Sequence, residues 1–203
     1  MSLEEACAAL GLHLGRRQVA LLLKFRDLLV AWNRRLDLVA PAPPDEILRA
    51  HVLDSLLLLV MSEPHPGALV ADVGTGAGLP GLVWAVARPD LRLVLLEPRR
   101  KRAAFVERAA SELGVHNAEV VAQRAEALSR DPRWAGRFDL LVARAVAPPQ
   151  KVLRAAGSLL KPGARLVVPV GPGQPVPGGF REVAREVPWE PGKVRRLAVG
   201  LVV

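Results

Sequence analysis

The sequence predicts an α/β protein with a doubly wound, mostly parallel, seven-stranded sheet and an N-terminal helical extension. Three observations predict this fold. Short apolar runs alternate with helical stretches from residue 68 onward, a glycine-rich loop follows the first run, and residues before 67 have helical apolar spacing. Apolar strands that alternate with helices are typical of a parallel sheet covered on both faces. We therefore expect a helical segment of residues 1–66 to pack on a sheet domain of residues 67–203.

The N-terminal segment is predicted to contain three helices. Ser2 and Glu5 have the spacing of a capping box at the start of the first helix, and Gly11 ends it. Apolar residues between 21 and 36 recur at helical intervals and form one broad apolar face. A proline-rich break follows, and a third helix is expected over residues 45–61.

Five apolar runs predict the parallel strands, and these runs are residues 68–73, 91–96, 119–122, 139–142 and 164–170. A helix over residues 99–113 follows the second run. Near the end of the chain, residues 180–187 and 194–203 flank a turn at 188–192 that is rich in proline. This tail is predicted to form an antiparallel hairpin that closes the sheet.

The glycine-rich loop over residues 72–81 is the segment most indicative of function. Glycines let the backbone turn tightly and bring main-chain N–H groups against a ligand. Residues 76–81 match the dinucleotide-binding pattern, and Glu97 lies near the place of its ribose-binding acid. The loop is also similar to the acidic-x-Gly-x-Gly-x-Gly signature of S-adenosylmethionine enzymes, with Asp72 as the acid. The dinucleotide pattern gives no reason for Asp72, so the second interpretation accounts for more of the loop.

Three further groups lie at predicted strand ends, where doubly wound folds bind their ligands. Glu97 ends the second strand, and its carboxylate can accept hydrogen bonds from both hydroxyls of a ribose. Residues 123–126 follow the third strand, where this fold usually holds the base of its cofactor. Arg144 follows the fourth strand among small residues, which favours a place in the ligand crevice over a surface salt bridge.

The distribution of charge favours a polyanionic partner. The chain has 28 basic and 20 acidic residues, for a net charge of +8, and the excess lies in residues 67–203. Four cations at residues 99–102 open a predicted helix, where they oppose the helix dipole. This placement favours contact with a phosphate backbone. The alternative is biased codon usage, which fits the 23 arginines against 5 lysines.

Composition argues against several other classes. No apolar run reaches the roughly 18 residues that a membrane-spanning helix needs. The acidic N-terminus argues against a secretory signal. The single cysteine, Cys7, excludes an intramolecular disulfide and a multi-cysteine metal site. We therefore expect a cytoplasmic protein that does not associate with membranes and uses no metal.

Taken together, these segments resemble the ribosomal RNA small-subunit methyltransferase G family, also called glucose-inhibited division protein B. The matching segments follow one another in the order found in the family, at residues 32–38, 51–55, 72–81, 101–105, 124–126 and 144–145. Asp37 and Glu97 depart from the family pattern, which often has Asn and Asp there. The resemblance implies a Rossmann-like methyltransferase fold. It also implies transfer of a methyl group from S-adenosylmethionine to N7 of a guanine in 16S ribosomal RNA.

The resemblance further implies the residues of the site. Those for the cofactor are Gly74, Gly76, Gly78, Leu79, Glu97, Ala125, Glu126 and Arg144. Asn33 and His51, in segments that resemble the family, are candidates for contact with RNA, and Arg99, Arg100 and Lys101 are candidates because of the basic run at residues 99–102. A structural hydrogen-bond pair between His51 and Asp54 is an equally good interpretation of that segment. The implied partner is 16S ribosomal RNA or the small ribosomal subunit, and we expect the chain to act as a monomer.

The residues agree with guanine N7 as the acceptor by elimination. Methylation of a pyrimidine carbon normally needs a cysteine nucleophile, and Cys7 lies in the first predicted helix. Exocyclic amines are usually methylated with an Asn/Asp-Pro-Pro-aromatic loop, but residues 147–150 read Ala-Pro-Pro-Gln. N7 loses no proton on attack, so alignment suffices, and Arg144 is the one catalytic candidate. Two alternatives stay open: an NAD-dependent oxidoreductase, and a non-catalytic RNA-binding factor on a methyltransferase scaffold.

Overall fold

The computed structural model describes residues 1–201 and confirms the predicted fold class. Seven strands form one sheet in the order β3-β2-β1-β4-β5-β7-β6. The parallel strands are β1 (Leu69–Val73), β2 (Arg92–Leu96), β3 (Ala118–Val121), β4 (Phe138–Val142) and β5 (Leu160–Val170). The predicted closing hairpin is confirmed, because β7 (Val194–Leu201) pairs antiparallel with both β5 and β6 (Phe180–Glu186). The last two residues of the predicted strand over 194–203 lie outside the described residues.

The fifth strand begins earlier than the sequence predicts. It starts at Leu160 rather than near residue 164, and it runs through Pro162 and Gly163. Phe138 pairs with Leu160, and the register between β4 and β5 then shifts before the next pairs. Such an irregularity tolerates a proline and a glycine, which usually interrupt strands. Because proline and glycine usually interrupt strands, Pro162 and Gly163 led the sequence-based prediction to start β5 too late.

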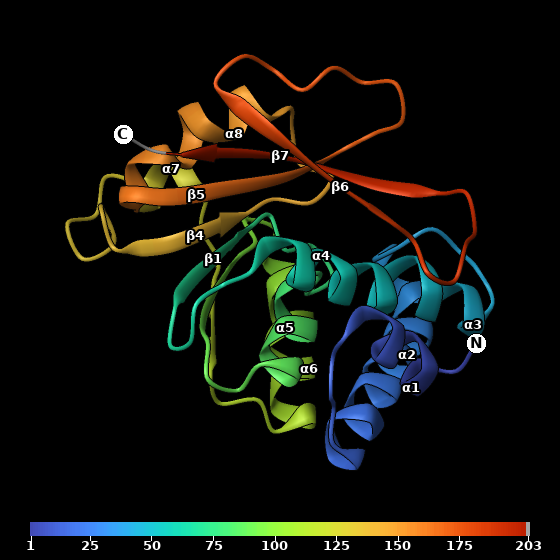
Figure 1. Ribbon diagram of the computed structural model, residues 1–203. Coiled ribbons are helices and arrows are strands. Elements are labelled where there is room, and N and C mark those ends of the chain that lie inside the picture. Colours follow the sequence, from blue (N-terminus) through green and yellow to red (C-terminus); the bar gives the residue numbers. More distant parts are fainter. Residues whose placement is uncertain (202–203) are drawn as a thin grey trace.

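Helices cover both faces of the sheet (Figure 1). One face carries α4 (Asp54–Ser62), α5 (Gly81–Ala87) and α6 (Arg100–Leu113), with α1 (Leu3–Leu10) and α2 (Arg16–Leu36) packed against them. The other face carries α7 (Ala125–Leu128), α8 (Pro149–Ala156) and the 3-10 turn η2 (Gly157–Leu159). The third predicted helix is present as α3 (Pro44–Ile47), the π-helical stretch η1 (Leu48–Leu53) and α4 in succession. In residues 1–201, no helix is long and apolar enough to cross a membrane.

Alternate residues of one strand enter different cores. Leu93 and Leu95 of β2 pack in the layer of α5 and α6, whereas Val94 and Leu96 pack in the layer of α7 and α8. Burial on both faces explains why these strands are uninterrupted apolar runs in the sequence. Phe25 of α2 is fully buried in the first of these cores, so the N-terminal helices share a core with the sheet. The division into units at residues 66 and 67 stays a prediction.

Local side-chain hydrogen bonds define the ends of the N-terminal helices. The N–H of Glu5 donates to Ser2 Oγ at 3.1 Å, and the N–H of Ser2 donates to Glu5 Oε2 at 2.7 Å. The predicted capping box is therefore confirmed. At the other end of this segment, α2 gives way to Asp37 with a φ of 45°, and the Val39 N–H donates to Asn33 Oδ1 at 2.9 Å. Asn33 thus stabilises the turn that follows α2.

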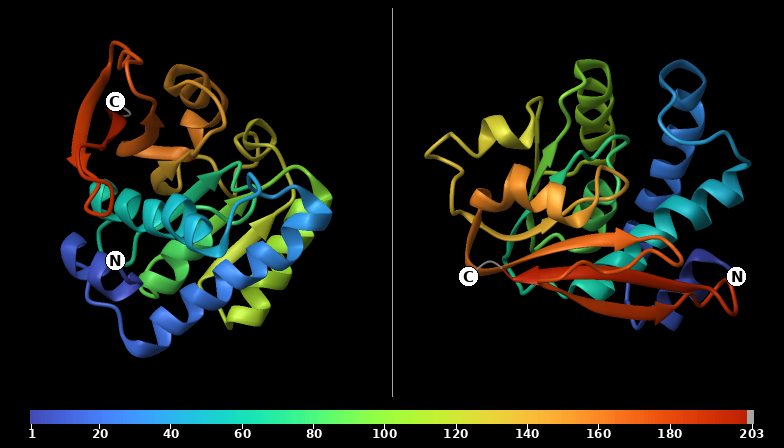
Figure 2. Two further views of the ribbon diagram at one scale, coloured as in Figure 1. Left: turned by 90° about the vertical axis from the view of Figure 1, so that its right-hand side faces the viewer. Right: turned by 90° about the horizontal axis from the view of Figure 1, so that it is seen from above.

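The C-terminal hairpin reaches the N-terminal helices. Figure 2 shows the hairpin of β6 and β7 passing beside the helical segment. Arg185 Nη2 of β6 donates to the carbonyl oxygen of Leu10, the last residue of α1, at 3.4 Å. The hairpin therefore contacts α1 through Arg185, and Leu197 and Val199 of β7 belong to the same core as the N-terminal helices.

Candidate active site

The glycine loop connects the carboxyl end of β1 to α5. Gly74, Gly76 and Gly78 have φ values of 70°, 60° and 84°, which side chains other than glycine rarely adopt. Between them, the N–H of Thr75 donates to the carbonyl oxygen of Leu96 at 2.9 Å. This bond holds the loop against the end of β2. The repeated glycines therefore reflect a backbone conformation that the loop needs at the edge of the sheet.

Asp72 ties the glycine loop to the start of α5. Its side chain is fully buried, and its Oδ2 accepts hydrogen bonds from Thr75 Oγ1 at 2.6 Å and from the Gly81 N–H at 2.8 Å. Its Oδ1 is buried without a hydrogen-bond partner among residues 1–201. Burial raises the pKa of the Asp72 carboxyl to about 6, against the lowering effect of the two hydrogen bonds and of Arg144. Asp72, the acid of the signature, thus acts as a clamp between the glycine loop and α5 through its Oδ2. Its Oδ1 remains an acceptor without a partner among the described residues.

Glu97 holds the opposite side of the same loop. Its side chain is 4% exposed, and its Oε2 accepts a hydrogen bond from the Gly76 N–H at 3.0 Å. Its Oε1 accepts one from the Arg99 N–H at 2.8 Å. Each oxygen of an ionised carboxylate can accept more than one hydrogen bond. Glu97 is therefore held in one orientation and can still accept hydrogen bonds from a ligand.

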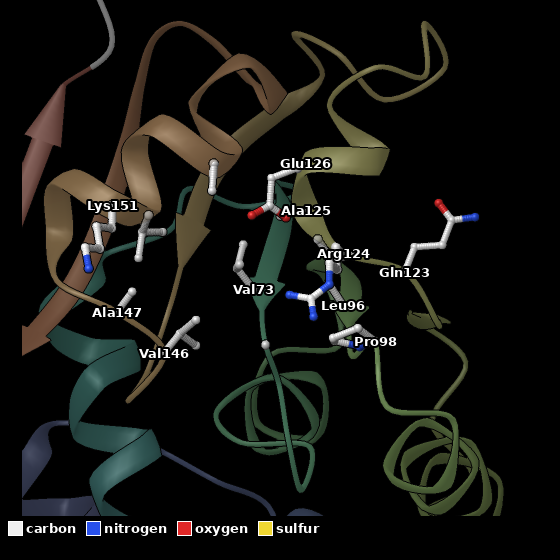
Figure 3. Close-up of a pocket in the computed structure, with 13 residues that line it drawn as sticks. Val73, Leu96, Pro98, Gln123, Arg124, Ala125, Glu126, Val146, Ala147 and Lys151 are labelled. Carbon is white, nitrogen blue, oxygen red and sulfur yellow. The ribbon is translucent and has the colours of Figure 1, made fainter.

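A cavity of about 290 Å³ lies beside these residues (Figure 3). Most of its wall is apolar and comes from Val73, Leu96, Pro98, Ala125, Val146, Ala147, Val152 and Ala155. The remaining wall residues are Gly74, Gln123, Arg124, Glu126 and Lys151. Figure 3 shows the side chains of Arg124 and Glu126 extending toward the cavity, whereas Gln123 turns outward. An apolar cavity with a few charged groups is typical of a small-molecule site.

The predicted cofactor residues occupy different places around this cavity. Those that line it are Gly74, Ala125 and Glu126. Gly76 and Glu97 are hydrogen-bonded to each other beside it. Gly78 is covered by Leu82, whose Cδ1 would lie 2.7 Å from a Cβ at residue 78. Leu79 is 4% exposed within the core, so Gly78 and Leu79 shape the turn into α5 rather than line the cavity.

The sequence does not predict the wall of the cavity that α8 and the loop before it form. Lys151, Val152 and Ala155 come from α8, and Val146 and Ala147 come from the loop before it. The sequence of α8 shows amphipathic spacing, which predicts that one face is buried but not what it faces. Its contribution to the cavity follows only from the packing of α8 against β5 and α7, which brings it to the same cavity as Val73 and Leu96.

Arg144 does not line the cavity and belongs instead to a cluster of polar side chains beside it. Its Nη1 donates to Asp54 Oδ2 at 3.2 Å, and its Nη2 lies 3.4 Å from His51 Nδ1. Asp54 is 7% exposed and also forms an ion pair with Arg195 of β7. His51 and Asp54 thus both contact Arg144, and both come from the N-terminal helical segment that was predicted to pack on the sheet domain.

The environment of His51 predicts a pH dependence of stability. Burial, together with the charge of Arg144, lowers the pKa of His51 to about 4, although Asp54 raises it. Between pH 6.5 and 4 the unfolded chain binds a proton at this residue that the folded chain does not, so stability falls as pH falls. We expect the free energy of unfolding to decrease more from about pH 7 to about pH 5 in the parent protein than in His51→Gln.

Urea denaturation at about pH 7, 6 and 5 measures this difference. The largest contribution from one such group is about 1.4 kcal/mol per pH unit. The raised pKa of Asp72 acts in the opposite direction, but it is common to both proteins and cancels in the comparison. Parallel pH profiles for the two proteins would contradict the prediction.

The basic residues at the start of α6 are exposed beside the glycine loop. Arg99, Arg100 and Lys101 are all exposed, whereas Arg102 is half-buried. Arg102 Nη2 donates to the carbonyl oxygen of Asp37 at 2.8 Å and joins the start of α6 to the end of α2. The predicted basic run therefore divides into three cations that face solvent and one that connects two helices.

The sequence is similar to proteins of one named family. The sequence model of the family described as rRNA small subunit methyltransferase G matches residues 18–172. A protein of that name from Moorella thermoacetica is 38% identical over 163 residues, which cover 80% of this chain and 68% of the relative. Another from Nitrosospira multiformis is 41% identical over 162 residues, 79% of this chain and 71% of the relative.

A similar solved structure is a SAM-dependent methyltransferase from Aquifex aeolicus. It has a TM-score of 0.57 and 18% identity, and the match covers 78% of this chain and 93% of that one. At this identity the likeness concerns the fold alone. Doubly wound sheets in general bind their ligands at the carboxyl ends of the strands, and the glycine loop, Glu97 and the cavity lie at those ends in this chain.

Proposed function

The chain belongs to the rRNA small subunit methyltransferase G family and so is an S-adenosylmethionine-dependent methyltransferase, and we propose that it methylates N7 of a guanine in 16S ribosomal RNA. The match over residues 18–172 carries this proposal, because it includes the glycine loop and the strand ends that form the cavity. The relatives are named as methyltransferases. These names argue against both alternatives, the NAD-dependent oxidoreductase and the non-catalytic RNA-binding factor. A cytoplasmic location, a monomeric state and action on the assembled small subunit stay predictions.

The residues around the cavity fit S-adenosylmethionine. Glu97 would accept hydrogen bonds from the ribose hydroxyls, while Ala125 and Glu126 would bracket the adenine in the apolar part of the cavity. The unpaired, buried Oδ1 of Asp72 is an acceptor that a bound group or a water molecule would satisfy. When bound, the cofactor supplies an electrophilic methyl group on a sulfonium. Among the described residues, no group of three or more His, Cys, Asp or Glu side chains could hold a metal ion.

The chemistry of the site supports guanine N7 as the acceptor. Burial, with a smaller effect of Glu4, raises the pKa of the Cys7 thiol to about 11, so this residue is not a thiolate nucleophile. Ala147 and Pro148 occupy the place where amine methyltransferases use a polar residue and a proline, and Ala147 lines the cavity. The N7 lone pair needs alignment with the methyl group and no proton acceptor. Because its pKa is lowered, the His51 ring is uncharged near pH 7 and adds no positive charge beside Arg144.

The exposed cations at the start of α6 are proposed to contact the RNA backbone. Arg34 and Arg35 at the end of α2 are also exposed, and Arg102 joins this helix end to α6. Arg102 Nη1 lies 4.0 Å from where a Cβ on Gly76 would be, so the start of α6 borders the glycine loop, and Arg102 joins the end of α2 to it. Cations gathered beside the cofactor loop would hold the phosphates that flank the target nucleotide.

Charge reversal tests this RNA contact. We expect Arg99→Glu with Arg100→Glu to weaken RNA binding at low salt by at least about tenfold and to reduce the salt dependence by roughly two phosphate contacts. The affinity for S-adenosylhomocysteine should be unchanged. Arg92→Glu with Arg137→Glu is the matched control, because these exposed arginines lie at the amino ends of β2 and β4. An equal loss of RNA affinity in both double variants would contradict the assignment.

Methyl transfer from labelled S-adenosylmethionine to small-subunit ribosomal RNA tests the function directly. The RNA is offered both naked and in subunits, and the product nucleosides are separated. We expect the label in 7-methylguanosine. Label in another nucleoside would keep the enzyme class and overturn the acceptor atom. Absence of label on both substrates would overturn the proposed function.

A further inference from the structure

Arg195 lies in the C-terminal hairpin, yet it contacts the cluster beside the cofactor cavity. Its guanidinium forms an ion pair with Asp54 Oδ1, at the start of α4. The second oxygen of Asp54 accepts the hydrogen bond from Arg144 Nη1 at 3.2 Å. Because each carboxylate oxygen binds a different arginine, the side chain of Asp54 has one favoured orientation. A chain of contacts therefore runs from β7 to the loop after β4.

The segment that Arg144 begins forms part of the cavity wall. It comprises residues 144–147, and we call it the wall segment. Ala145 has a φ of 56°, a conformation that non-glycine residues adopt only when surrounding contacts hold them there. Val146 lines the cavity, and its Cγ2 lies 2.7 Å from where a Cβ on Gly74 would be. The position of Arg144 therefore bears on how Val146 covers the glycine loop.

We propose that Arg195 is a positioning residue for the cofactor site. It holds the Asp54 carboxylate so that Asp54 fixes Arg144, and through Arg144 the wall segment, against the glycine loop. Without Arg195, the Asp54 carboxylate is free to rotate and bind the Arg144 guanidinium with both oxygens, which draws Arg144 toward α4. The inference rests on the proposed binding of S-adenosylmethionine but not on the identity of the methyl acceptor.

Two observations favour this role over a purely structural tie between the hairpin and α4. The Nε of Arg195 is buried and has no hydrogen-bond partner among the described residues, so the contact is not optimised for stability. Removal of Arg195 also leaves Asp54 paired with Arg144, so no buried carboxylate loses all its partners. The variant should therefore fold and show its defect in the cavity.

The test compares Arg195→Met with Arg196→Met. Arg196, the next residue of β7, pairs with Glu182 of β6 at 2.6 Å and does not contact Asp54. Titration calorimetry with S-adenosylhomocysteine should show affinity reduced at least fivefold in Arg195→Met and within twofold of the parent in Arg196→Met. Arg195→Lys, which restores one charged donor, should recover part of the affinity. The nitrogen-15 signals of the His51 ring should shift in Arg195→Met, because Arg144 lies 3.4 Å from its Nδ1.

Unchanged affinity in a folded Arg195→Met would overturn the proposal, as would equal losses in the Arg195 and Arg196 variants. If Arg195→Met does not fold, Arg195→Gln takes its place, because its neutral side chain also lacks the charge that pairs with Asp54. Parent-like affinity with parent-like His51 signals in Arg195→Gln would overturn the proposal. The outcome for the proposed function is separate. If the parent protein does not bind S-adenosylhomocysteine, both the proposed function and the role of Arg195 are contradicted. Label in a nucleoside other than 7-methylguanosine would contradict only the proposed acceptor atom.

Discussion

Replacement of Gly81 with alanine is expected to lower the free energy of unfolding by about 3–5 kcal/mol. A Cβ at residue 81 would lie 2.2 Å from Leu95 Cδ2 and 2.8 Å from Asp72 Oδ2. These atoms are buried between β1, β2 and α5, so they cannot move aside without disturbing the core. The hydrogen bond from the Gly81 N–H to Asp72 would also lengthen, leaving a buried carboxylate with one fewer donor.

Urea denaturation with Gly178→Ala as the control tests this expectation. A Cβ at residue 178 would have no other atom within 4 Å, and Gly178 has no positive φ, so its alanine variant should stay within about 0.5 kcal/mol of the parent. Equal stability of the Gly81 and Gly178 variants would show that the start of α5 can adjust to a side chain. That result would also remove the clamp role assigned to Asp72.

The second large effect is expected from Glu97→Gln, which should weaken binding of S-adenosylhomocysteine by about 10- to 100-fold. Glu97 accepts hydrogen bonds from two backbone N–H groups, those of Gly76 and Arg99. A glutamine has one acceptor oxygen, so its amide group would face one of these donors and could not bind a ribose hydroxyl as an acceptor. Loss of a hydrogen bond to a charged group costs roughly 1.5–3 kcal/mol, which corresponds to this range of affinity.

Titration calorimetry with S-adenosylhomocysteine compares Glu97→Gln with Glu119→Gln. The comparison tests whether affinity is lost because of a change at the cofactor site or because the protein has one negative charge less. Glu119 is exposed in β3, the strand next to β2, and does not border the cavity. Its variant should bind S-adenosylhomocysteine as the parent does. Parent-like binding by Glu97→Gln would instead remove Glu97 from the cofactor site and leave the cavity wall as the main source of affinity.

Most elements of the fold could be predicted because local interactions determine them. Apolar runs buried on both faces marked the parallel strands, and the Ser2–Glu5 capping box marked the start of α1. The prediction was less accurate where a long-range contact overrode a local preference. β5 continues through Pro162 and Gly163 because its pairing with β4 contains an irregularity, and no local signal shows this.

The sequence by itself determined the glycine loop, its two acids and their place at the ends of neighbouring strands, since these depend on backbone conformation and strand order. Only the tertiary structure decided which side chains meet. It placed Leu79 in the core, built a cavity wall from α8, and brought Arg144 and Arg195 to Asp54 across 90 and 141 residues of chain. An arginine has the same local preferences whether it faces water or a buried carboxylate. Its partner is therefore determined by the packing of distant elements, which residue spacing does not encode.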